Sequence, residues 1–343
     1  SPGPSVSPGP SVSPGTRPAA GPGPSPATSC PVLRAAGTGP ALTSVVAGRT
    51  SAPDATTVVL VNATGGAEAY AEAMGVAPFA AAHGAPVLLT GTTSVPDVVA
   101  RDIVDRKVTT AWIVGSTASV GPAVEQRLRS LGVTTVRRVT GGDRWSTAAE
   151  LALGAATGPR SGAASHEAFL VPGDPGQQLD VASAAATAAA TGRPLLLTGR
   201  AGVPAVTLNA LRSLKVTSVT VVGSPAVVPE QTLTALRGAG VTTWKRVVGP
   251  TRWATATAVA AAAGPGLPVD RVVLTSGLVA GPELLLASAQ GRPLLLTTAT
   301  GLPGPTAAWL AGHRTATVTV VAPPGLVQTA VLVAAQTTRR PVR

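Results

Sequence analysis

The chain is poor in aromatic residues and almost free of cysteine. Aromatic side chains make up only 2% of its 343 residues, so a folded core must consist mainly of alanine, valine and leucine. A single cysteine, Cys30, excludes an intramolecular disulfide and a thiolate metal site. Since no uninterrupted apolar run reaches the ~18 residues typical of a membrane-spanning helix, we expect no membrane insertion.

Motifs for catalysis and cofactor binding are also missing from the sequence. The histidines His83, His166 and His313 stand alone, without the spacing of a metal-binding pair. Neither a Gly-x-Ser-x-Gly nucleophile elbow nor a phosphate-binding loop of the Walker type occurs. A nucleotide-binding enzyme has only loosely placed glycines, such as Gly173 and Gly277, to support it. We therefore expect no catalytic residues, no metal and no cofactor.

Positive charge is the strongest compositional bias after alanine richness. The net charge is +11, and 23 of the 26 basic residues are arginine. GC-rich coding favours such a composition, but an excess this large also indicates an anionic partner. The planar guanidinium group suits bidentate capture of carboxylate or phosphate. Nucleic acid is not the expected partner, because the arginines are scattered and no nucleic-acid-binding motif accompanies them.

Internal repetition is the most informative feature of the chain. Residues 137–150 and 245–258 both contain Arg-Trp-x-Thr-Ala, at an offset of 108 positions. A second shared segment, Pro-(Leu/Val)-Leu-Leu-Thr, occurs at 86–90, 194–198 and 293–297. Three domain-sized repeats indicate a multivalent surface rather than a single catalytic centre.

These repeats divide the chain into five parts. They are a disordered Pro/Ser/Gly-rich linker (1–29), a degenerate first repeat (30–133), a second repeat (134–242), a truncated third repeat (243–335) and a basic tail (336–343). The linker has too few apolar residues to bury a core. Each repeat has so few large side chains that we expect the modules to pack against one another within the chain.

Short apolar runs alternate with Ala-rich segments inside each repeat. The second repeat predicts strands at 135–140, 168–171, 194–198 and 218–222, and helices at 144–156, 179–191, 204–214 and 229–240. Continuous apolar strands separated by helices are typical of parallel sheets covered on both faces. We therefore predict an α/β fold of three tandem Rossmann-like modules with about four strands each.

The order of these motifs resembles the cell wall-binding repeat 2 family. Gly-Gly-Asp-Arg-Trp-Ser-Thr-Ala at 141–148 is followed by a strand, an Asp-led helix at Asp180, Pro-Leu-Leu-Leu-Thr and a Val-Val-Gly strand end. The resemblance extends over about residues 30–335. It implies three Toprim-like modules around a pseudo-threefold axis, in a secreted cell-surface protein. It also implies noncovalent binding to an anionic glycopolymer of the cell wall. The composition and the Pro-Ser-Gly spacer favour a protein of actinobacterial type.

The three copies depart from the family pattern at several positions. Pro40 stands at the arginine position of the first copy, and Thr251 replaces the aspartate in the third. The counterpart of Asp180 is Glu72 in the first copy, and near Val279 in the third copy it is missing. These departures put polymer binding by the first and third repeats in question.

Nine residues are candidates for polymer binding or for contact between modules. They are Asp143, Arg144, Trp145, Thr147, Asp180, Thr251, Arg252, Trp253 and Thr255. Asp143 and Thr251 occupy N-cap positions. An arginine in the first helical turn opposes the helix dipole, so Arg144 and Arg252 need an anionic partner. That partner is either a ligand or an internal carboxylate that bridges two modules.

The other candidates have a structural and a functional interpretation. Trp145 and Trp253 either stack on sugar rings or, as is more common at the second position of a helix, pack into the core. Asp180 is most simply a residue that complements a helix dipole. The basic pairs at 137–138 and 245–246 either line a cleft between modules or keep an edge strand soluble.

Together these features predict a noncatalytic wall-anchoring protein with a flexible arm and three α/β repeats. The alternative is a degenerate α/β ligand-binding or hydrolase module that acts on a substrate derived from the cell wall.

Overall fold

The computed structural model describes most of the repeat region. The described residues are Gly3, 31–62, 73, 75–161, 165–174 and 176–338. The expected disordered arm (1–29) lies outside the described residues except for Gly3, and the expected basic tail is described only as far as Thr338. Within the described part of the chain, no helix has the length and apolar character needed to cross a membrane.

Four parallel strands form the first sheet, in the order β3-β2-β4-β5. Its elements in chain order are β2 (Thr57–Asn62), α3 (Val76–His83), β3 (Val87–Thr90), α4 (Asp97–Asp105), β4 (Thr110–Val114), α5 (Pro122–Ser130) and β5 (Thr135–Val139). Helix α1 (Pro40–Ser51) precedes them and packs against the edge strand β3.

The second sheet repeats this topology, in the order β7-β6-β8-β9. Its elements are α6 (Arg144–Ala156), β6 (Glu167–Pro172), α7 (Gln178–Thr191), β7 (Leu195–Thr198), α8 (Ala205–Ser213), β8 (Ser218–Val222), α9 (Glu230–Leu233), the 3-10 helix η1 (Thr234–Ala239) and β9 (Thr243–Val247). The helices and strands predicted for this repeat agree with the observed ones to within one residue at each end, except that the last helix is split into α9 and η1. Gly238 lies in the 3-10 part, where its low helix propensity disfavours a regular α-helix.

The third sheet has the order β1-β12-β10-β11. Its elements are β1 (Val32–Arg34), α10 (Arg252–Ala262), the 3-10 helix η2 (Gly264–Gly266), β10 (Arg271–Ser276), α11 (Pro282–Ser288), β11 (Leu294–Thr297), α12 (Gly304–Gly312), β12 (Thr317–Val320) and α13 (Thr329–Thr338). All strand pairs in the three sheets are parallel, so the predicted α/β class is confirmed.

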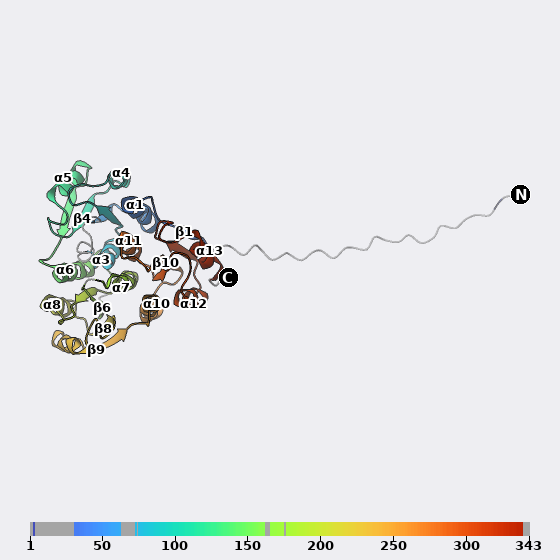
Figure 1. Ribbon diagram of the computed structural model, residues 1–343. Helices are drawn as coiled ribbons and strands as arrows, with labels where there is room; N and C mark the ends of the chain where they lie inside the picture. Colours follow the sequence, from blue (N-terminus) through green and yellow to red (C-terminus); the bar gives the residue numbers. More distant parts are fainter. Residues whose placement is uncertain are drawn as a thin grey trace.

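The sheets are displaced by one strand from the sequence repeats. Strand β5 begins the second repeat but pairs with β4 of the first sheet, and β9 begins the third repeat but pairs with β8. In the same way, β1 at the start of the first repeat pairs with β12. The third repeat, which the sequence predicts to be truncated, therefore receives its fourth strand from the first repeat. This exchange closes the three modules into a ring (Figure 1).

Strand β7 buries both of its faces, although it lies at the edge of the second sheet. In the second sheet, Leu195 and Leu197 pack with residues of α7, whereas Leu196 packs with residues of α8 and α9. Successive side chains of a strand point to opposite faces, so a strand covered on both sides has no polar position. This explains the uninterrupted leucines in the Pro-Leu-Leu-Leu-Thr segments.

Helices α3, α7 and α11 lie at the centre of the molecule (Figure 1). Helix α7 packs against α3, α10 and α11, and every residue from Val181 to Ala188 is buried. Its alanines permit close approach of the neighbouring helices because they add little width. One core cluster joins Phe79 of the first module, Ala182 of α7 and Leu286 of the third module. The modules thus pack intramolecularly, as predicted.

Each sheet has an arginine on one edge strand, β1, β5 or β9, that binds the segment after the neighbouring strand. Arg34, Arg138 and Arg246 each donate at least two hydrogen bonds to carbonyl oxygens after the neighbouring strand, a contact that we call the arginine clasp. The acceptors are Ala322 and Val327 for Arg34, Gly115 and Val120 for Arg138, and Gly223 and Val228 for Arg246. Arg138 and Arg246 also form ion pairs with Glu125 and Glu230. Arginine stands at this position in all three repeats, so the repeat pattern itself contains the signal for this contact, although these arginines were not among the nine predicted site residues.

Candidate functional site

Helices α6 and α10 begin at the Arg-Trp motifs. The Asp143 carboxylate accepts hydrogen bonds from the Ser146 backbone N–H at 2.7 Å and the Ser146 hydroxyl at 2.6 Å. The Thr251 hydroxyl accepts from the Ala254 N–H at 3.2 Å. Both predicted N-caps are confirmed. The hydrogen bonds from Ser146 stabilise the charged carboxylate and lower the pKa of Asp143.

Both motif arginines lie at the carboxyl ends of parallel strands. Arg144 Nη1 donates to the carbonyl oxygen of Gly173 at 3.1 Å, and Arg252 Nη1 to that of Gly277 at 2.8 Å. These glycines directly follow the central strands β6 and β10. Arg144 is half-buried, whereas Arg252 is exposed. The carboxyl edge of an open parallel sheet is where α/β folds commonly bind ligands.

The tryptophans of the motif pack against the core. Trp145 and Trp253 are partly buried and contact two different core clusters. Their indole nitrogens are buried, have no hydrogen-bond partner among the described residues and lie against the strand-end glycines. A Cβ atom at Gly173 would lie 3.0 Å from Trp145 Nε1, and one at Gly277 would lie 2.9 Å from Trp253 Nε1. This packing supports the core interpretation over sugar stacking for both side chains.

The motif threonines brace the loop that precedes each helix. The buried Thr147 accepts a hydrogen bond from the Gly141 N–H at 2.9 Å, and the buried Thr255 accepts one from the Gly249 N–H at 3.0 Å. A Cβ atom at Gly249 would approach the Ala254 backbone to 2.6 Å, so this loop requires glycine. Thr147 and Thr255 therefore position the arginine indirectly.

Asp180 and Arg252 come together across a module boundary. Asp180 lies in the first turn of α7 and Arg252 in the first turn of α10, and these helices pack against each other. Burial raises the pKa of Asp180, and the positive charge of Arg252 partly offsets this effect. The proximity supports the interpretation that Arg252 helps to join the second and third modules.

The raised pKa of Asp180 predicts a pH-dependent contribution to stability. Because its folded-state pKa lies above the ordinary value of 3.8, the folded protein binds this proton at a higher pH than the unfolded chain does. Acidification through the folded-state pKa should therefore stabilise the wild type relative to Asp180→Asn. Urea unfolding of both proteins, from neutral pH downwards, measures this difference. Both proteins contain Asp143, so its lowered pKa affects both equally and cancels in the comparison. A difference that is independent of pH would contradict the prediction.

The two motifs do not converge on one site. Helix α6 packs against α3, so Arg144 lies at the boundary of the first and second modules, whereas Arg252 lies at the next boundary. At the third boundary, Pro40 begins α1, which packs against α11. Glu72 lies outside the described residues, and Val279 is exposed in the loop before α11.

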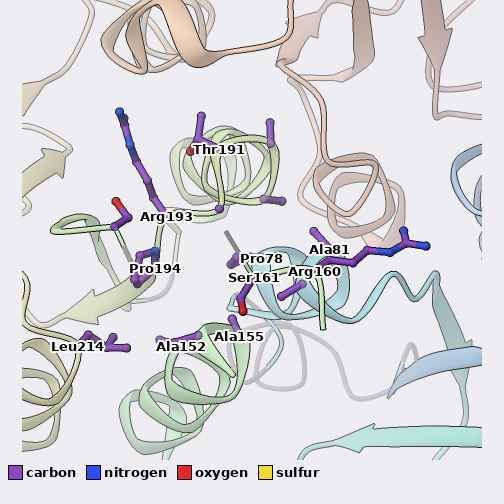
Figure 2. Close-up of a pocket in the computed structure, with 16 residues that line it drawn as sticks. Pro78, Ala81, Ala152, Ala155, Arg160, Ser161, Thr191, Arg193, Pro194 and Leu214 are labelled. Atoms are coloured by element: carbon purple, nitrogen blue, oxygen red, sulfur yellow. The ribbon is translucent and has the colours of Figure 1, made fainter. Parts of the chain in front are cut away.

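A cavity of about 360 Å³ lies between the C-terminal parts of α3, α6 and α7 (Figure 2). Small side chains such as Pro78 and Ala152 line it, whereas Arg160 and Arg193 extend away from its centre. Arg193 instead forms an ion pair with Glu167 at 2.7 Å. The walls are mostly apolar, so the cavity does not match the polar site that the sequence predicts. No group of three or more potential metal ligands occurs among the residues that the structure describes.

Two solved structures share this fold over nearly the whole chain. Cwp6 from Clostridium difficile matches with a TM-score of 0.79 and 20% identity, over 92% of this chain and 49% of that protein. Cwp8 from Clostridium difficile matches with a TM-score of 0.74 and 22% identity, over 90% of this chain and 51% of that protein. At these identities the likeness concerns the fold.

Two curated proteins of Bacillus subtilis (strain 168) are related in sequence. N-acetylmuramoyl-L-alanine amidase LytC is 28% identical over 169 residues, which cover 49% of this chain and 31% of that protein. The Amidase enhancer is 34% identical over 82 residues, which cover 24% of this chain and 10% of that protein. The chain thus spans less than a third of the length of either relative.

A family profile establishes the relationship that the motif order indicated. The profile of the Cell wall binding domain 2 (CWB2) family matches residues 28–125 and 138–233, more than half of the chain. The matched segments correspond to the first two repeats, and the third sheet has the same strand topology. The chain therefore belongs to the Cell wall binding domain 2 family.

Proposed function

We propose that this chain is a noncatalytic anchor that holds a secreted protein on the bacterial cell wall by binding an anionic secondary wall polymer. The observation that carries the proposal is Arg252, an exposed cation at a helix N-terminus, where the helix dipole disfavours it. Arg144 has the same place and the same type of hydrogen bond in α6. Family membership supports the wall as partner, and the net charge of +11 supports an anionic one.

In the Arg-Trp motif, the hydrogen-bond donors for the polymer are guanidinium N–H groups that the fold holds in place. Nη1 of Arg252 is committed to the Gly277 carbonyl, which orients the guanidinium group and leaves Nη2 and Nε to meet a phosphate or carboxylate. Asp143 and Thr251 cap their helices, and the packed indoles fix the first turn. Repeated weak contacts along one polymer add up through multivalency, so a deep pocket is not required.

Retention on purified wall sacculi tests this function. We expect the chain to bind intact sacculi, to lose binding when the anionic polymer is extracted, and to bind less as salt rises above physiological strength. Salt acts in this way because exposed charges are screened beyond about 8 Å at that strength. Equal retention on stripped sacculi would contradict binding through the anionic polymer.

Variants of the two arginines separate a ligand role from a structural role. We expect Arg252→Ala and Arg144→Ala each to weaken sacculus binding about tenfold, which corresponds to about 1.4 kcal/mol. Stability should fall only modestly, by about 1–2 kcal/mol, because each variant loses a hydrogen bond to a strand-end carbonyl and Arg252→Ala also loses the favourable charge interaction with Asp180. Arg314→Ala removes an exposed arginine outside the motifs and serves as the control for net charge. Full binding with a strongly lowered melting temperature in both motif variants would make the motif purely structural.

A further inference from the structure

A second cleft lies between the first sheet and helix α6 of the second module. It encloses about 440 Å³, which is within the usual range of ligand pockets. Trp112 and His83 line it from the first module, and Glu150 and Gly154 of α6 line it together with Thr157, the C-cap of that helix. Their spacing in α6 places these three residues on one face of the helix. We call this cleft the Trp112 groove.

The Trp112 groove contains an aromatic cluster, in a chain with only 2% aromatic residues. Phe79 contacts Trp112 edge to face, with ring centroids 5.2 Å apart, and the His83 ring lies 5.2 Å from Trp112. The guanidinium carbon of the exposed Arg137 lies 5.3 Å from the centre of the indole ring. A half-buried indole beside a cation combines an apolar surface with positive charge.

This aromatic cluster is not needed by the repeated fold. Strand pairing places Thr220 of the second sheet and Thr319 of the third at the position of Trp112. On the neighbouring edge strand, Arg137 is paired with Trp112. The corresponding partners are Lys245 for Thr220 and Leu33 for Thr319. At the boundary of the second and third modules, Lys245 instead donates a hydrogen bond from Nζ to the Ala262 carbonyl at 3.0 Å. Two modules therefore pack without an aromatic ring where the first module has one.

His83 and the rim of the groove supply polar groups. His83 Nδ1 lies 2.9 Å from the Phe79 carbonyl oxygen, which only accepts hydrogen bonds, so Nδ1 carries the proton. In the neutral ring Nε2 is then a hydrogen-bond acceptor. Glu150 and Thr157 are exposed at the α6 side and offer further acceptors and a hydroxyl. An apolar ring face with acceptors around it matches the C–H face and the hydroxyls of a sugar.

We infer that the Trp112 groove is a subsite for one acidic pyranose unit, a ligand chemistry that goes beyond the motif arginines and rests on the proposed polymer binding. The sugar ring packs on Trp112, its hydroxyls donate to His83 Nε2 and Glu150, and its carboxylate or phosphate pairs with Arg137. This subsite involves the first sheet and α6, whereas Arg144 and Arg252 lie at the carboxyl ends of β6 and β10.

The indole N–H signals of the intact chain report on this subsite directly. The chain has five tryptophans, and Trp112→Thr identifies the signal of Trp112 by its disappearance. This variant installs the residue that the other two sheets carry, so we expect an unchanged fold. Trp112→Phe provides a second assignment that keeps an aromatic ring. We expect glucuronic acid to shift the Trp112 signal and to leave those of the packed Trp145 and Trp253 in place.

Two sugars and two Arg137 variants test whether the acidic group of the sugar binds Arg137. Glucose, which lacks the carboxylate, should bind about tenfold more weakly than glucuronic acid. Arg137→Leu, the residue of the third sheet, should remove this preference, whereas Arg137→Lys, the residue of the second, should retain it. A Trp112 signal that stays in place with glucuronic acid, or that shifts equally with both sugars, would overturn the inference. Sacculus retention by the unmodified chain is measured separately, so failure of the subsite and failure of wall binding give different results.

Discussion

Deletion of residues 1–36, which removes β1, is expected to lower the free energy of unfolding by at least about 4 kcal/mol. The deletion removes the ladder that pairs Val32 with Val318 and the hydrogen bond from Ala35 N–H to the Val320 carbonyl. It also removes the arginine clasp of Arg34, so the carbonyls of the buried residues Ala322 and Val327 in the segment after β12 lose this donor. The third sheet would then expose an unpaired edge.

Urea unfolding measures this effect, with deletion of residues 1–30 as the matched control because it leaves β1 intact. Arg34→Ala isolates the clasp and should cost about 2–3 kcal/mol, since two carbonyl acceptors lose a charged donor. Arg246→Ala removes the equivalent clasp of the second sheet and should have a similar effect. Equal stability of the two deletions would show that β1 does not complete the third sheet.

An isolated middle repeat, residues 134–242, is expected to show no cooperative thermal transition. This segment carries β5, whose partner β4 is absent, and it lacks β9 with the clasp residue Arg246. It also exposes the faces of α7 that pack against α3, α10 and α11 in the whole chain. An Ala-rich module of this size buries too little apolar surface to replace those contacts.

Residues 140–248 provide the structural comparison, because they contain all four strands of the second sheet and helix α6. We expect this segment to be more stable than 134–242 by about 4 kcal/mol, because it keeps the pairing of β9 with β8 and the clasp of Arg246. It should still be less stable than the whole chain. Circular dichroism melts of both segments and of the whole chain measure the order. A sharp transition of 134–242 at the melting temperature of the whole chain would contradict interdependence of the modules.

Most local structure followed from residues that are close together in the sequence. The N-caps Asp143 and Thr251 bind N–H groups three positions away, so the motif alone predicts where α6 and α10 begin. The leucine runs predict buried strands because a parallel strand covered on both faces has no polar position. The fold class, the number of strands in a module and the family were accessible for the same reason: each copy repeats these short-range signals.

The tertiary structure alone decided which distant segments meet. An edge strand and a central strand carry similar apolar runs, so nothing in the sequence near Val32 identifies Val318 as its partner. Asp180 approaches Arg252 only because α7 packs against α10, and the Trp112 groove forms only where the first sheet meets α6. Local periodicity determines which face of an element is buried, whereas the packing of separate elements determines what covers that face. The repeats therefore predicted the modules, and only the assembled ring revealed their shared strands and boundaries.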